Sequence, residues 1–203
     1  MIDNNERDIE DAKIAKRLGE VGIHVNSIYD LVNTSKPYPQ AIPVLINLLQ
    51  EGIISNDRIK EGIIRSLAVK EAKGIGLGRL LIEEFNKIPK GNIDVGWVIG
   101  NTMDVIVGEE DIDGILKIIG NKTNGTSRQM FVHALGKIKK PSEEVENVLV
   151  DLLYDDDVVV FAIGALAKLK LSKGNHIIKE LVNHSRPLVR KTASKAVLKL
   201  GII

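Results

Sequence analysis

The chain has 203 residues, of which 44% are hydrophobic, and it is close to neutral, with 28 basic and 27 acidic side chains. The absence of cysteine excludes disulfides, thiolate metal sites and thiol nucleophiles, and the net charge of +1 gives no overall attraction to nucleic acid or membranes. Because only 3% of the residues are aromatic, the core must be aliphatic, which favours packed helices over a sandwich or barrel.

The beginning of the chain is polar and acidic, which is unlike a secretory signal peptide. No apolar run approaches the roughly 18 residues that a membrane-spanning helix requires. We therefore expect a soluble cytoplasmic protein with no membrane partner.

Amphipathic helices are predicted along the whole chain, which we expect to form one domain over residues 1–203. Residues 6–34 predict two short capping helices, the first ending at Gly19, and a linker with two prolines follows them. Helical pairs are then predicted over residues 39–70, 77–107, 112–139, 145–171 and 174–201. One such pair cannot cover its own apolar faces, so the pairs should stack on one another.

The second helices of the pairs align as a repeat. Leu67, Met103, Leu135, Leu166 and Val197 fall in one column, with steps of 36, 32, 31 and 31 residues. A second column holds small residues: Thr102, Ala134, Ala165 and Ala196. Small side chains at these positions would let neighbouring helices approach closely.

The last second helix resembles that of a HEAT repeat. The resemblance rests on residues 189–193 (VRKTA) followed by 196–201 (AVLKLG), and residues 133–138 (HALGKI) are similar. It covers about residues 39–201, and only the first two units depart from it, with Gly62 or Gly96 inside the second helix. The resemblance implies an all-α, right-handed superhelix of about five repeats plus the N-terminal cap. It also implies that the second helices line a concave face.

Helical periodicity predicts which side chains face this groove. In residues 127–138, Gln129, His133 and Gly136 lie opposite the apolar stripe. The corresponding positions of all the second helices give the predicted binding surface: Glu61, Arg65, Trp97, Asn101, Asp104, Gln129, His133, Val160, Gly164, Lys191 and Lys195.

Two of these groove positions have an alternative interpretation. Trp97 is either an interface anchor, a role that tryptophan often has, or it fills space left by Gly96 and Gly100. Val160 and Gly164 either form a binding patch or pack under a neighbouring helix.

Charge is uneven along the chain, with a net charge of −5 over residues 1–111 and +6 over residues 112–203. Lys191, Lys195 and Lys199 fall on one helical face, close to Arg186 and Arg190. This strip could bind an acidic protein segment or a phosphate backbone. Alternatively, it is a polar terminal cap whose cations suit the helix dipole.

No pattern in the sequence predicts catalysis. None of the four histidines is followed by glutamate, which excludes the ligand set of HEAT-like di-iron hydroxylases, and no HExxH motif occurs. Trp97 with Asn101 and Asp104 is the one candidate for chemistry like that of HEAT-like DNA glycosylases. His133 has no evident carboxylate partner at a suitable spacing.

Two further motifs have structural interpretations. The glycine-rich stretch 74–78 (GIGLG) is predicted to be a linker, because no strand precedes it as a dinucleotide fingerprint would require. The acidic run Asp155 to Asp157 is predicted to form a turn and to cap the helix that follows.

The function that the sequence favours is a non-catalytic protein–protein interaction module. We expect it to bind a protein or peptide in the concave groove and to need no cofactor or metal. The alternative is a nucleic-acid-binding protein, with a possible role in DNA repair, that uses the basic C-terminal half.

Overall fold

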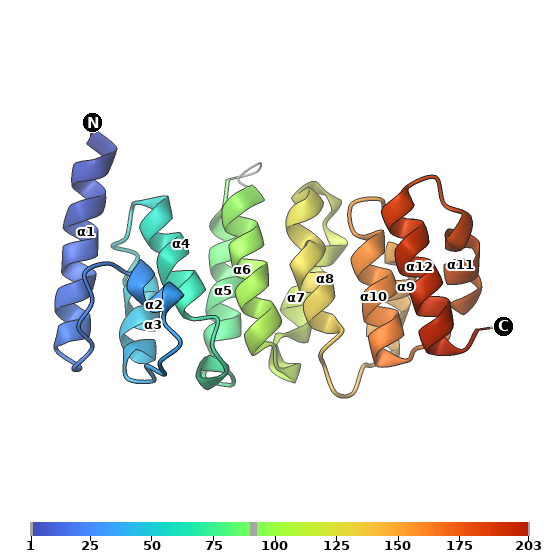
Figure 1. Cartoon of the computed structure of the whole chain (residues 1–203), viewed down its shortest axis with the longest axis horizontal. Helices are drawn as coiled ribbons and strands as arrows, with labels where there is room; N and C mark the ends of the chain where they lie inside the picture. The colour runs from blue at the N-terminus through green and yellow to red at the C-terminus, as the bar shows by residue number, and fades with distance from the viewer. Residues whose placement is uncertain (1, 90–92, 203) are drawn as a thin grey trace.

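A computed structural model describes residues 2–89 and 93–202, with only the backbone described for residues 2–6 (Figure 1). All regular secondary structure in these two ranges is helical, which confirms the all-α prediction. Among the described helices, none is both long enough and apolar enough to cross a membrane. The α-helices are α1 (Ile2–Gly19), α2 (Tyr29–Asn33), α3 (Ala41–Glu51), α4 (Asp57–Ser66), α5 (Leu77–Lys87), α6 (Ile93–Ile106), α7 (Ile112–Gly120), α8 (Gln129–Leu135), α9 (Glu143–Asp151), α10 (Val159–Leu169), α11 (Asn175–Glu180) and α12 (Pro187–Leu200).

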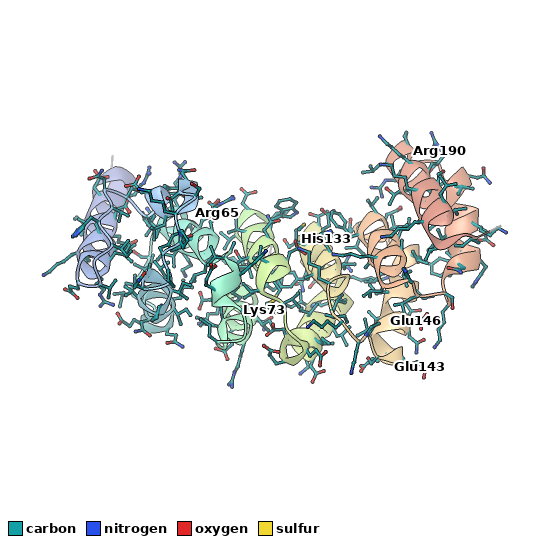
Figure 2. The ribbon with its side chains drawn as sticks, turned by 60° about the horizontal axis from the view of Figure 1, so that its bottom comes forward. Arg65, Lys73, His133, Glu143, Glu146 and Arg190 are labelled. Carbon is teal, nitrogen blue, oxygen red and sulfur yellow. The ribbon has the colours of Figure 1, made fainter. Side chains whose placement is uncertain are left out.

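The helices stand side by side in one elongated row, with the two chain ends at opposite ends of the row (Figure 1). From α3 onward they pack as consecutive pairs, and α4, α6, α8, α10 and α12 each contact the next one in this series. We call these five the second-helix layer. In Figure 2 the row curves towards the side on which Arg65, His133 and Arg190 of this layer lie, while Glu143 and Glu146 of α9 lie on the other side.

Close packing within the second-helix layer depends on small residues. Thr102 is buried between α6 and α4, and its hydroxyl donates a hydrogen bond to the carbonyl of Ile64 at 3.0 Å. At Gly100 of α6, an added Cβ would lie 2.8 Å from the Cβ of Met130 in α8. Gly136 is also buried, because an added Cβ there would lie 3.1 Å from the Cα of Ala165. The prediction that Gly136 faces the groove is therefore wrong.

The N-terminal helix α1 is joined to the first pair by a buried carboxylate. Glu10 is 5% exposed and accepts hydrogen bonds from the amide of Ser55 at 2.8 Å and its hydroxyl at 2.7 Å, and from the amide of Asn56 at 3.2 Å. Burial would raise the pKa of Glu10, but the hydrogen bonds from Ser55 and Asn56 outweigh it and lower the pKa. The Glu10 carboxylate thus satisfies backbone donors just before α4 begins.

Candidate binding surface on the second-helix layer

Five of the predicted groove residues lie on two helices that pack against each other. Trp97, Asn101 and Asp104 follow one another at helical spacing on α6, and Gln129 and His133 do so on α8. All five are partly or fully exposed. The two stripes of side chains therefore form one continuous surface across α6 and α8.

Trp97 is 40% exposed. The space beside the neighbouring glycines is occupied by other side chains: an added Cβ would lie 2.9 Å from Ser127 Oγ at Gly96, and 2.8 Å from Met130 Cβ at Gly100. These glycines thus permit α6 to approach the next pair closely. The indole of Trp97 lies partly in solvent, where a partner could contact it.

About two helical turns beyond Trp97, a polar cluster joins α6 to the end of α8. Nδ1 of His133 lies 2.8 Å from Oδ1 of Asp104, so the expectation that His133 has no carboxylate partner is wrong. Nζ of Lys137 donates to Oδ2 of the same Asp104 at 2.5 Å and to its backbone carbonyl at 2.8 Å. The ammonium and the carboxylate offset each other's charge, and the carboxylate holds the half-exposed imidazole in place.

The predicted groove residues nearest the N-terminus pair with each other. Nη2 of Arg65 lies 2.6 Å from Oε1 of Glu61, an ion pair within α4. On α10, Val160 is half-buried and packs against the core, whereas Gly164 is exposed with open space above it. The second-helix layer is therefore charged at Glu61 and Arg65 of α4 and uncharged at Val160 and Gly164 of α10.

The predicted basic strip divides into structural arginines and unpaired lysines. Arg190 donates to the carbonyls of His184 and Ser185, and Arg186 donates to the carbonyl of Asp156. Lys191 and Lys195 are exposed on α12, and neither forms an ion pair or side-chain hydrogen bond with any described residue. The arginines therefore stabilise loops, and the lysines remain free to meet an anionic partner.

The acidic turn before α10 has a role that the sequence prediction missed. Val158 occupies the N-cap position without a side-chain cap, so the prediction that these aspartates cap α10 is wrong. The turn itself is as predicted, because Asp155 accepts a hydrogen bond from the amide of Asp157 at 3.1 Å. The carboxylates otherwise bind arginines of the flanking pairs, Arg128 on one side and Arg186 on the other.

Arg128, which immediately precedes α8, is the largest fully buried side chain among the described residues. Its guanidinium donates to both carboxylate oxygens of Asp155, at 2.8 and 3.2 Å, and to the carbonyls of Ile119 and Gly125 at 3.1 and 2.9 Å. Burial would raise the pKa of Asp155, but the hydrogen bond and charge of Arg128 outweigh it and lower the pKa. This ion pair therefore links two consecutive helical pairs from the inside.

Comparison of the chain with models of known protein families, with curated proteins and with solved structures found no match.

Proposed function

We propose that this chain is a HEAT-like solenoid that works as a non-catalytic interaction module in the cytoplasm. Its second-helix layer would bind an extended segment of another protein and would need no cofactor. Trp97 is the central anchor, and the cluster of Asp104, His133 and Lys137 supplies hydrogen bonds beside it. The observation that carries the proposal is an indole 40% exposed on the same face of α6 as Asp104, whose partners His133 and Lys137 are held in place by their contacts with it.

Several features support an interaction surface over an inert one. Large aromatic side chains supply much contact area for little loss of conformational freedom, and they dominate the energy of many interfaces. The fixed imidazole offers a hydrogen-bonding group that loses little entropy when it binds. The stacked pairs add a long, continuous face on which an extended peptide can lie.

The proposal is tested by selecting peptides from a random phage-displayed library on the immobilised protein. Selected peptides should lose about 2 kcal/mol of binding free energy, roughly thirty-fold in Kd, with Trp97→Ala. Tyr154→Ala is the matched control, because Tyr154 is an aromatic residue 73% exposed on another part of the chain. Circular dichroism and thermal unfolding should show that both variants keep the fold.

Two results would count against peptide binding at this surface. One is that peptides bind Trp97→Ala as tightly as the unmodified protein, and the other is that Trp97→Ala unfolds the stack. Nucleic-acid binding is the rival outcome. It predicts that affinity for a labelled duplex falls steeply with salt, with a log–log slope of several units.

A further inference from the structure

Three lysines stand in equivalent positions at the ends of consecutive helices of the second-helix layer. Lys137 lies two residues after the end of α8, Lys168 lies in the last turn of α10, and Lys199 lies in the last turn of α12. They are separated by one repeat of 31 residues each, and all three are exposed. We call these three residues the lysine ladder.

The helices that carry the ladder lysines pack against one another, α8 against α10 and α10 against α12. Burial lowers the pKa of Lys168, and the positive charges of Lys137 and Lys199 lower it further, against the opposing effect of Asp104. Asp104 belongs to the cluster beside Trp97, so the ladder is continuous with the surface described above. The fold thus holds like charges together along one edge of its second-helix layer.

The carboxylates of the chain leave most of this charge without a partner. Lys137 is paired with Asp104, but neither Lys168 nor Lys199 forms an ion pair with any residue that the structure describes. The helix dipole favours a cation at each C-terminal end, which explains each lysine by itself. The dipole does not require that lysines recur at the same position of three consecutive helices, or that two of them have no carboxylate partner.

The usual distance between packed helices, each of which carries one ladder lysine, fits one kind of anionic chain. Packed helices lie about 8–10 Å apart. An extended peptide in the polyproline II conformation has three residues per turn and rises about 3.1 Å per residue, so every third side chain returns to the same face after roughly 9 Å. Single-stranded nucleic acid instead needs aromatic side chains on which its bases can stack, and Trp97 is the one tryptophan of the chain.

We propose that the lysine ladder binds an extended acidic segment of a partner protein that carries Asp or Glu at every third position. The proposal rests on the peptide-binding function argued above and names the chemistry of its ligand. The segment would place its carboxylates on Lys168 and Lys199 and continue past Lys137 towards Trp97. Lys191 and Lys195 extend the positive charge along α12 and would guide its approach.

The test uses a fluorescein-labelled peptide of four Glu-Pro-Ser repeats, in which proline favours the polyproline II conformation. The control peptide has the same composition with its glutamates consecutive. Fluorescence anisotropy should show that the spaced peptide binds at least about five times more tightly than the clustered one, and that binding weakens between about 50 and 200 mM NaCl.

Charge reversal locates the site. Lys168→Glu with Lys199→Glu should raise the Kd of the spaced peptide by about ten-fold or more. Lys36→Glu with Lys117→Glu is the matched control: it changes the net charge equally at two exposed lysines outside the second-helix layer, and should change the Kd by less than about two-fold. Circular dichroism should show unchanged helicity in both double variants.

Three outcomes would overturn the proposal: no binding of the spaced peptide, no preference over the clustered peptide, or equal losses in both double variants. A labelled oligothymidine that binds more tightly than the spaced peptide, in a ladder-dependent way, would assign the ladder to nucleic acid and also overturn it. If selected phage peptides require Trp97 but tolerate the charge reversal at Lys168 and Lys199, only the acidic partner is refuted and the peptide-binding function stands.

Discussion

The buried Arg128 offers the sharpest test of how consecutive pairs are held together. The side chain of Arg128 is 1% exposed. Arg128→Met keeps most of its aliphatic stem but removes the guanidinium. The change leaves Asp155 without its partner and two backbone carbonyls, those of Ile119 and Gly125, without their donor. Removing one member of a buried ion pair typically costs about 3–5 kcal/mol.

The structure places the expected value at the lower end of that range. The side chain of Asp155 is 10% exposed, so water can reach part of the abandoned carboxylate, and we expect a loss of about 3 kcal/mol. Arg186→Met is the matched control, because Arg186 precedes α12 and binds the same acidic turn through Asp156. That pair is 46% and 78% exposed, so its removal should cost less than about 1 kcal/mol.

Urea denaturation at neutral pH, followed by circular dichroism, measures both losses. A stack of repeats can unfold in parts, and free energies of unfolding are comparable only between variants that unfold in one transition. The dependence of the free energy on urea concentration must therefore be similar in all the variants. Equal losses for Arg128→Met and Arg186→Met would refute the reasoning, since burial is the main difference between the two arginines. A loss below about 1 kcal/mol for Arg128→Met would refute it as well.

Two further predictions concern packing and pH. Gly100→Ala should lower the free energy of unfolding by about 1–3 kcal/mol, because α6 and α8 must separate to admit a methyl group. Gly164→Ala, in open space, should raise the free energy of unfolding by about 0.5–1 kcal/mol. The urea midpoints of the two variants measure this difference. The lowered pKa values of Asp155 and Glu10 mean that folding favours their charged forms. Stability should therefore be full above their ordinary pKa values of 3.8 and 4.5 and fall as the pH drops through the lowered values. Asp155→Asn should flatten this acid dependence, and an unchanged pH profile would contradict it.

Local sequence signals predicted helices well where a residue typical of a helix start and one typical of a helix end are both present. The second helix of the pair predicted over residues 174–201 is α12, with Pro187 at its start and Gly201, at φ 64°, after its end. The helix predicted over residues 127–138 is shorter, because a 3-10 segment, Lys122–Arg128, precedes α8. In this segment Arg128 donates hydrogen bonds to Gly125 and Asp155. Asp155 lies 27 residues further along the chain, so no local sequence pattern could predict that contact.

The same distinction applies to the candidate binding surface. Helical periodicity fixes which side chains share a face of one helix, and it placed Trp97 and His133 on partly exposed faces. It does not fix how far α6 is shifted along its axis relative to α8. That shift brings Asp104 beside His133 and Lys137, so the pairing could be found only from the packed helices. The neighbours of Gly96 and Gly100 were unpredictable for the same reason, since Ser127 and Met130 come from the next pair.

The acidic turn before α10 and the lysines that end α10 and α12 differ in how their charges are used. Acidic side chains precede α10, and lysines lie in the last turns of α10 and α12, so both sets of charges complement helix dipoles. If the dipole were the whole reason, both sets of charges would be equally unpaired. The carboxylates are instead bound by Arg128 and Arg186, whereas Lys168 and Lys199 have no carboxylate partner among the described residues.

Stability and binding should therefore respond to different variants. Arg128→Met should lower the urea midpoint but leave the affinity of the folded protein for the spaced acidic peptide unchanged. Charge reversal at Lys168 and Lys199 should do the opposite: it should weaken peptide binding and lower the urea midpoint only slightly. A carboxylate in the last turn of a helix costs about 0.3–1 kcal/mol, and the loss of repulsion between like charges offsets part of that cost. If the charge reversal instead lowered stability as much as Arg128→Met does, the lysines would be part of the structural framework, and the distinction between the acidic turn and the lysine ladder would be wrong.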